Sequence, residues 1–590
     1  MSARRGRAAV GDDDLMPTTR GRLRRLLPSR TPWRQKTRQE RGIAMVWLAM
    51  SLLTMVLFAG FAVDVSNWYL RAERIQRAAD AGAHAGVAFL PADLSTATTT
   101  AKKETAMNGY PQGGSQNTAI AVTQEPNPNR LRVKISTDVP TYFLNLIGIS
   151  KIRMTRQAVA EYIAPVPMGS PENKLGNDPA RNQTTPQFWI NVAAPNSTKV
   201  SGDRYQAKVC DTSVANCTGT ANPGISNDDY SYDGYFFALK VKNVVSGQPL
   251  NVQVYDPAFT YVGDKCEYNM PTQTEADALQ ALPGNPYPDA SSRYAPGLTK
   301  WCTGDQDIGG RTNHTTFIVR APDNTPWSDT DNPVVSGCTV TEPAFTPNQN
   351  GQGTIKQMLT PTDAKYDSQF AALFRQNVTI CSVPAGQVKT GDYILQVRTN
   401  ATSANPTAYS SSVNDGGHNR MSIFAGFGTT GLANVDGTNV AINARGRLPI
   451  YANADAANTT FYLARVLPYD AGRTLRVTLY DMGDASSAGT LQILPPTEFA
   501  STFSGCDFTR SDGGSMSTSP STCTISNVSS STGFNGRIVT IDIPIPANYT
   551  CSDTLGTGCW IKVRAAFPSG VSDTTTWAAA ILGNPIRLVE

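Results

Sequence analysis

Histidine is scarce in this chain of 590 residues, which contains only His84, His314 and His418. None of the three lies near a Ser or Cys motif, and no pair of cysteines has the C-x-x-C spacing. A nucleophilic triad, a zinc site and a thiol redox centre therefore have little material here. We expect no catalytic residue, no cofactor and no enzymatic activity.

Charged residues are also few, at 17% of the chain against about a quarter in typical soluble domains. Glycine (48) and proline (39) are abundant, together with Thr, Ser and Asn. Short strands joined by turns suit this composition, whereas long amphipathic helices do not. The larger part of the chain therefore resembles extracellular β-structure.

Cysteine is absent from the first 209 residues. The ten cysteines all lie after this region: Cys210, Cys217, Cys266, Cys302, Cys338, Cys381, Cys506, Cys523, Cys551 and Cys559. An even number confined to one region is typical of export to an oxidising compartment. Pairing nearest neighbours gives 210–217, 266–302, 338–381, 506–523 and 551–559, although sequence alone does not fix the connectivity.

Charge is missing altogether from Gly42 to Val63, a run of 22 residues. As a helix this run is about 33 Å long, enough to cross a hydrocarbon core of about 30 Å. A secretory signal has an apolar core of only about 7–15 residues. A buried core helix is the alternative, but we predict a retained transmembrane helix over 42–63.

The orientation follows from the basic tail. Residues 1–41 contain twelve Lys and Arg against four Asp and Glu, a net charge of +8, whereas the whole chain has +4. Basic flanks stay on the cytoplasmic side of a membrane. We therefore predict a single-pass protein of the cytoplasmic membrane, with residues 1–41 inside and the carboxy-terminal region outside. No nucleic-acid-binding module accompanies the tail.

Beyond Asp64 the helical pattern continues to about Pro91. One stripe of this helix is apolar and mostly small, and it would let another helix approach closely: Val65, Trp68, Ala72, Ile75, Ala79 and Ala83. The stripe is either an interaction face for another subunit or a face that packs on strands of its own domain. Strand-like patterns at 131–135 and 152–163 predict a small pilin-like domain over 64–165.

The segment ERGIAMVWLAMSLLTMVLFAGFAVDVSNWYLRAERIQRAADAGAHAGVAFL resembles the Flp/Tad (tight adherence) pilus-assembly proteins of the TadE/TadG-like type. The shared features are RG before the span, AVD at its outer end and the AADAGAHAG run. The resemblance extends over roughly residues 40–165 and implies a bacterial membrane protein of pilus assembly or cell adhesion. Its partners would be other pilus-assembly proteins, or itself, through the helix. Trp47 stands where prepilin processing requires Glu, which favours a permanent anchor.

The exported region contains an internal repeat. At an offset of 225, Phe236, Leu250, Val252 and Tyr255 match Phe461, Leu475, Val477 and Tyr480, and three further segments match in the same order. Alternating apolar and polar residues predict half-buried strands in both copies. We predict a membrane-anchored α+β protein in which a linker (166–186) precedes two tandem all-β sandwich or jelly-roll domains, 187–425 and 426–590.

Two kinds of ligand site suggest themselves. Asp256, Asp481 and Asp484 follow strands and are candidates for calcium, although turn-capping Asp is the simpler interpretation. Four tryptophans are candidates for stacking on a sugar, although core packing is commoner: Trp189, Trp301, Trp327 and Trp560. The alternative function is therefore an anchored surface protein that binds a glycan or another cell-envelope ligand.

Overall fold

A computed structural model describes the chain from residue 38 to 589. The segments outside the description are 91–92, 178–187, 211–213, 219–225, 264–265, 297–300, 302, 304–312, 324, 326–327, 429–436, 455–457, 486, 553–557, 569–570 and 584. Most of the predicted tail, together with Cys302 and Trp327, lies outside the described residues. The chain forms two compact units. One contains the described residues up to Arg71 with Val139–Ile152, and the other contains Ala72–Asp138 with Arg153 onward.

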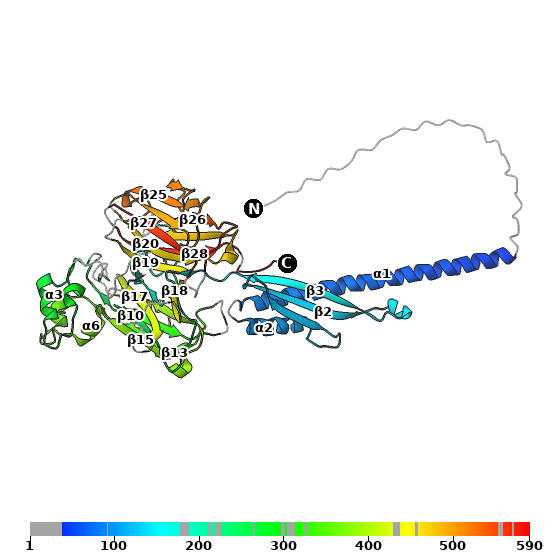
Figure 1. Ribbon diagram of the computed structural model, residues 1–590, viewed down its shortest axis with the longest axis horizontal. Helices are drawn as coiled ribbons and strands as arrows, with labels where there is room; N and C mark the ends of the chain where they lie inside the picture. The colour runs from blue at the N-terminus through cyan, green and yellow to red at the C-terminus, as the bar shows by residue number, and fades with distance from the viewer. Residues whose placement is uncertain are drawn as a thin grey trace, which may run out of the picture. The chain divides into compact units, whose positions relative to one another are not determined.

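Helix α1 (Arg38–Val87) is one unbroken helix of 50 residues, drawn in blue in Figure 1. Between Gly42 and Val63 its residues are exposed, apart from Gly60. Among the described residues, α1 is the one helix that is long and apolar enough to cross a membrane. The predicted continuation of the helix beyond Asp64 is confirmed.

A small antiparallel sheet follows α1. Helix α2 (Leu94–Met107) leads into β1 (Ala119–Gln124), β2 (Arg130–Pro140) and β3 (Lys151–Tyr162), with the 3₁₀ turn η1 (Leu144–Ile147) between the last two. The carboxy-terminal strand β29 (Ile586–Leu588) returns to pair with β3, giving the order β1-β2-β3-β29. The two strands expected from sequence are therefore present, and the last residues of the chain complete their sheet.

Two large sheets make up most of the chain that follows the small domain. The first contains β15 (Asn377–Val383), β10 (Leu250–Tyr255), β17 (His418–Phe427), β6 (Phe188–Ala193), β19 (Arg447–Ala454), β28 (Val571–Ile581), β21 (Thr474–Tyr480), β26 (Ile538–Pro544) and β23 (Asp507–Arg510), in that order, with β5 (Lys174–Leu175) beside β17. The second contains β13 (Val334–Glu342), β12 (Thr315–Arg320), β16 (Gly391–Arg398), β9 (Tyr235–Val241), β18 (Val440–Arg445), β4 (Pro167–Met168), β20 (Asn458–Arg465), β27 (Trp560–Ala566), β22 (Gly489–Leu494), β25 (Thr524–Val528) and β24 (Ser517–Ser519). Their inner faces share one hydrophobic core.

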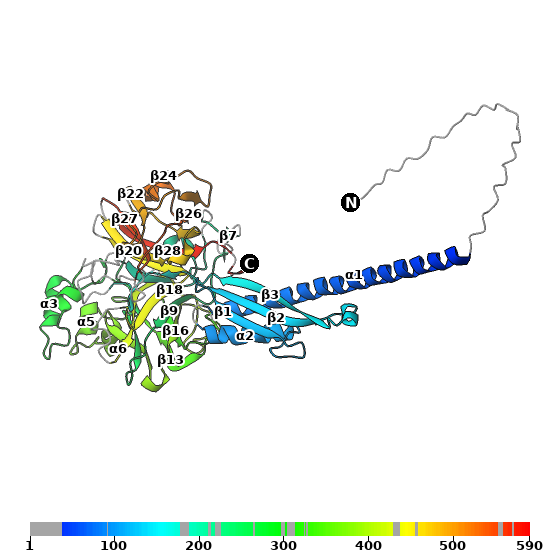
Figure 2. The same cartoon turned by 45° about the vertical axis from the view of Figure 1, so that its right-hand side comes forward.

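The order of the strands reflects the internal repeat. In the first sheet, counted outward from the β6–β19 pair, β17 and β10 of the first copy occupy the same places as β28 and β21 of the second. In the second sheet, counted outward from the β18–β4 pair, β9, β16 and β12 occupy the same places as β20, β27 and β22. Figures 1 and 2 show strands of the first copy (green to yellow) and of the second (yellow to red) in one body. The two copies are joined side by side.

One detail of the sequence alignment differs from the structure. Phe461 corresponds to Phe237 and not to Phe236. Phe461 lies in the core opposite Val563, and Phe237 lies in the core opposite Leu395. A bulge between Tyr462 and Ala464 adds one residue to β20, so the offset of 225 holds only after it. A one-residue slip moves side chains to the other face of a sheet, which is why the bulge matters.

The predicted linker also differs in part. Residues 167–168 form β4, which pairs with β18 and β20, and residues 174–175 form β5, which pairs with β17. Both segments are largely buried, because they fill the centre of the sandwich where the two copies meet. Hydrogen bonding likewise continues across the boundary predicted at 425/426, since β18 pairs with β9 of the first copy.

The first copy contains a helical insertion, which was not predicted from the sequence. Between β10 and β15 the chain forms α3 (Gln273–Gln280), α4 (Ala290–Arg293), α5 (Ile355–Leu359) and α6 (Ser368–Leu373), which enclose a small core of their own. The short strands β11 (Phe259–Thr260) and β14 (Ala344–Phe345) pair beside them, and β7 (Cys217–Thr218) and β8 (Ser226–Asn227) pair elsewhere.

Four of the five nearest-neighbour disulfides are present: 210–217, 338–381, 506–523 and 551–559. The pairing of Cys266 with Cys302 falls outside the described residues. Cys338 in β13 and Cys381 in β15 join the two large sheets at one edge. Cys506 and Cys523, which directly precede β23 and β25, join them again in the second copy.

We predict that removing the 338–381 bridge by Cys338→Ser with Cys381→Ser lowers the free energy of unfolding by about 4 kcal/mol. The 551–559 bridge closes a much shorter loop (8 residues apart instead of 43), so removing it in the same way costs roughly 1.4 kcal/mol less. Urea unfolding of the full chain in detergent, followed by tryptophan fluorescence, measures both. Equal midpoints for the two variants would contradict the role assigned to loop length.

Candidate functional site

The apolar stripe on α1 is largely covered by its own domain. Ala72 is 7% exposed, and Ile75, Ala79 and Ala83 are completely buried. Val65 and Trp68 are half-buried. The prediction of an assembly face is therefore wrong for the four residues from Ala72 onward, and the alternative, packing against the same domain, is what the structure shows for them.

Small residues make this packing possible. A Cβ atom on Gly82 would lie 2.7 Å from the Thr105 methyl group of α2, and one on Gly86 would lie 2.7 Å from the carbonyl oxygen of Ala97. Ala97 and Ala101 on α2, and Leu131 and Val133 on β2, are completely buried. The AADAGAHAG run thus lets α2 and β2 approach the backbone of α1 closely.

The outer end of the predicted span is marked by Asp64. Its carboxylate is buried and accepts three backbone N–H groups, from Tyr142 (2.7 Å), Phe143 (3.0 Å) and Leu144 (2.8 Å). Asn67 adds a hydrogen bond from its Nδ2 to the Pro140 carbonyl (3.1 Å). The first charge after the apolar run therefore ties α1 to the turn between β2 and β3.

A second buried carboxylate, Glu161 on β3, joins four segments of the chain. It accepts hydrogen bonds from Arg130 at the start of β2 (3.1 Å), from Arg587 on β29 (2.8 Å) and from Arg473, which precedes β21. Burial raises the pKa of Glu161, but the three guanidinium groups lower it more, so that the pKa lies below its ordinary value. Glu161 connects the small sheet to the sandwich and to the end of the chain.

Two of the calcium candidates occupy equivalent places in the two copies. Asp256 follows β10 and Asp481 follows β21, both at positive φ (55° and 58°) and both 1% exposed. Asp256 accepts the N–H of Arg375, and Asp481 accepts the N–H of Gly536. Since these donors lie just before the equivalent strands β15 and β26, each Asp caps the backbone of a neighbouring loop.

Asp256 is further satisfied by the Thr303 hydroxyl, and burial raises its pKa to about 6. Around Asp481 the surroundings differ, because Asp484 and Asp573 lie near it. Asp573 accepts the N–H of Gly483 (2.7 Å), and burial raises the pKa of both Asp481 and Asp573, with repulsion between the carboxylates adding to it. One oxygen of each has no hydrogen-bond partner among the described residues.

Within the described ranges, no group of three or more His, Cys, Asp or Glu side chains is arranged to hold a metal ion. Of the three calcium candidates, Asp481 and Asp484 lie close to Asp573, which was not a candidate from the sequence. Asp256 lies apart from them, in the turn after β10.

The described tryptophans among the sugar-binding candidates are buried. Trp189, Trp301 and Trp560 are at most 4% exposed, and Trp189 stacks on Tyr255 with ring centroids 5.7 Å apart. A buried ring offers no face to a sugar, so core packing describes these three residues. His418 is likewise buried, in β17, and its Nδ1 lies 2.9 Å from Asn191 Nδ2.

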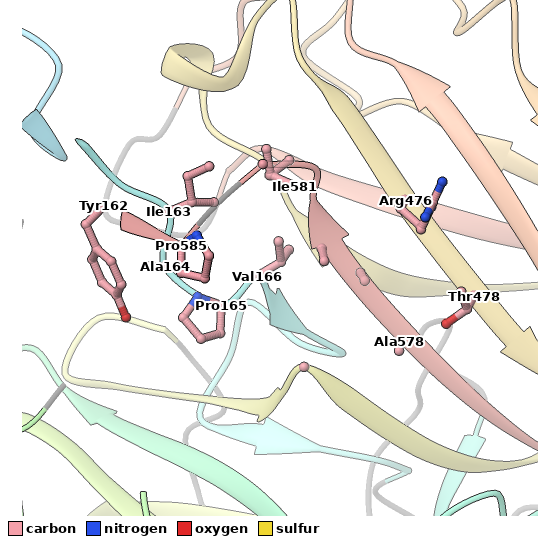
Figure 3. Close-up of a pocket in the computed structure, with 14 residues that line it drawn as sticks. Tyr162, Ile163, Ala164, Pro165, Val166, Arg476, Thr478, Ala578, Ile581 and Pro585 are labelled. Atoms are coloured by element: carbon pink, nitrogen blue, oxygen red, sulfur yellow. The ribbon is translucent and has the colours of Figure 1, made fainter. Parts of the chain in front are cut away.

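A groove of about 550 Å³ lies where the chain passes from β3 to β4. Figure 3 shows Ile163, Pro165, Val166, Ile581 and Pro585 around it, with Arg476 and Thr478 on β21. Arg476 is bound to Asp542 through two hydrogen bonds (2.7 and 2.6 Å), so its guanidinium is already engaged. The lining is mainly apolar and contains no paired nucleophile and base.

We predict that Ala79→Glu lowers the abundance of the protein in the membrane, because an unpaired carboxylate buried beside α2 costs about 3–5 kcal/mol. Arg74→Glu, on the exposed side of the same helix, serves as the matched control and leaves abundance unchanged. Quantitative immunoblotting of membranes measures both. Normal abundance of the Ala79 variant would show that this face is not packed as described.

Glu161→Gln is expected to lower the free energy of unfolding by about 3 kcal/mol at pH 7. This is the low end for a broken buried ion pair, because Arg130 and Arg587 are 38% and 40% exposed. A carboxylate whose pKa is lowered by folding stabilises the protein above its unfolded pKa and loses that effect as pH falls through the folded pKa. The difference between wild type and variant should therefore shrink below about pH 4, which urea unfolding at several pH values tests.

Asp573→Asn should have the opposite effect. A carboxyl group whose pKa is raised by folding contributes its full stability to the folded protein only below its unfolded pKa. This contribution is lost as pH rises through the folded pKa. The variant should therefore melt at a higher temperature than wild type at pH 7 in a chelator, and at a similar temperature at pH 4. If millimolar calcium raised the melting temperature of wild type and not of the variant, the cluster would bind a cation instead.

Comparison with known proteins gives one match. Residues 42–88 match the Tad family, described as "Putative Flp pilus-assembly TadE/G-like". No curated protein and no solved structure matches this chain. The matched residues are those of the predicted transmembrane run and of the part of the helix that packs against α2 and β2. The chain thus carries a TadE/G-like segment at residues 42–88, and the resemblance seen in these residues is confirmed.

Proposed function

We propose that this protein is a non-catalytic, single-pass component of Flp/Tad-type pilus assembly or of adhesion through such pili. Its amino terminus lies in the cytoplasm, and its double sandwich lies outside the cytoplasmic membrane. The observation that carries this proposal is the TadE/G-like helix α1, exposed and apolar over the predicted span and packed into a folded domain beyond Asp64.

Three further features support this arrangement. The basic tail of residues 1–41 has the charge that keeps a flank in the cytoplasm. The disulfides lie in the region placed outside, where an oxidising compartment lets them persist. The buried tie at Glu161 joins the sandwich to the domain that continues from the helix, so a load on the sandwich is passed to the anchor through paired strands and ion pairs.

The alternative function is an anchored surface protein that binds a glycan or another cell-envelope ligand. Its sugar-binding form relies on exposed tryptophans, and the three described candidates are buried and do not support it.

We predict that cells lacking this chain lose surface pili of the Flp type and that the full-length chain restores them. A version in which a cleavable signal peptide replaces residues 1–63 should be exported and should fail to restore pili, because it lacks the anchor. Electron microscopy and shear-fraction immunoblotting measure the pili. Restoration by the unanchored version would contradict the role of the helix, and undiminished pili in the deletion strain would contradict the proposed function.

The topology is tested separately. Protease added to spheroplasts should remove the chain beyond about residue 90 and leave an epitope tag in residues 1–41 protected, because the basic flank holds the tail inside. Detergent permeabilisation is the control and should expose the tag. Protection of the cysteine-containing region would invert the orientation.

A further inference from the structure

The turn between β2 and β3 exposes an unusual amount of apolar surface. Residues 139–150 contain no charge, and five large side chains in or next to η1 are exposed: Tyr142 (56%), Phe143 (42%), Leu146 (80%), Ile147 (66%) and Ile149 (44%). Hairpin tips in water usually present polar residues and glycine. A contiguous apolar patch of this kind marks a surface that contacts a membrane or another protein.

The turn belongs to the same compact unit as the predicted span, and contacts fix it there. Asp64 accepts the three N–H groups of Tyr142, Phe143 and Leu144, and the Phe143 ring lies against Gly60, where an added Cβ would be 2.5 Å from Phe143 Cδ1. Gly60 lies three residues before Val63, about 4.5 Å along the helix axis. The side chain of Phe143 therefore sits beside a part of α1 that lies inside the predicted span.

Charge supports the same placement. Asp64 is the first ionisable residue after the span, and it is completely buried beneath the turn, so its charge is paired with backbone N–H groups and hidden from lipid. The next charged residue after the turn is Lys151, which is exposed at the start of β3, where a lysine suits the headgroup region. Tyr142 has the amphipathic side chain that favours the membrane interface.

We propose that residues 142–149 form a second membrane contact, in which the apolar tip inserts into the outer leaflet beside α1 and Asp64 acts as the positioning residue. The partner is the lipid bilayer, because the tip is continuous with the surface of the predicted span. This inference rests on the proposed anchoring by α1. Its effect would be to fix the tilt and rotation of the helix, since two contacts restrict a rigid body more than one.

Spin labels on single added cysteines test this in the full chain, reconstituted into vesicles of phosphatidylethanolamine and phosphatidylglycerol. The test positions are Leu146→Cys and Ile147→Cys. Phe58→Cys, 71% exposed within the span, reports lipid, and Val244→Cys, 39% exposed in a turn of the sandwich, reports water. Wild type labelled without reductant gives the background from the native cysteines.

We expect the ratio of oxygen to nickel-chelate accessibility at 146 and 147 to resemble that at 58 and to exceed that at 244 several-fold. Asp64→Ala should release the tip and bring the ratio at 146 toward the value at 244, whereas Asp64→Asn, which keeps an acceptor, should change it less. A water-like ratio at 146 and 147 with a lipid-like ratio at 58 would overturn the inference alone. Low accessibility to both reagents would show a protein partner and overturn it too, and a water-like ratio at 58 would overturn the anchoring itself.

Discussion

Along α1 the surroundings change from an exposed apolar surface to a protein interior between Val63 and Ala72, and the helix crosses this change without a break. Before Val63 bulky apolar residues such as Leu57 and Phe58 are exposed, which fits a membrane anchor. On the other side alanine and glycine bring α2 and β2 close. Asp64 lies between the two regions, and its carboxylate is satisfied by three backbone N–H groups because water is excluded there. The order of residue types along one helix thus sets where the exposed apolar run ends and where the folded domain begins.

The folded domain depends in turn on Glu161. A buried carboxylate is unfavourable unless it is paired, and here arginines from three distant segments pair with it. Two of them, Arg473 and Arg587, come from the second copy of the repeat and from the end of the chain. The small domain therefore reaches its complete form only when the rest of the chain has folded, since β29 supplies the last strand of its sheet.

The sandwich shows how a duplication can be accommodated. In two separate sandwiches, the strands that now meet at the centre of each sheet would be edge strands, and unpaired edges are open to pairing with other chains. Joining the copies through β6 with β19, and through β18, β4 and β20, removes those inner edges and merges the two cores. The disulfides 338–381 and 506–523 then link the two sheets in regions that the merger does not strengthen.

Much of this was determined by local sequence. The uncharged run from Gly42 to Val63, the basic tail and the cysteine positions predict the span and four disulfides, because hydrophobicity, charge and short chain separations are local properties.

Some local signals for helices were present in the sequence but were missed. Asp93 caps α2, ahead of buried Ala97 and Ala101, and Thr272 with Glu275 forms a capping box at α3. What only the tertiary structure decided is which surface each element meets. Spacing along the sequence does not predict four features: the burial of Ala79 in its own domain, the bulge in β20, the closeness of Asp481 to Asp573, and the arginines around Glu161. Each of them depends on residues that are tens to hundreds of positions apart.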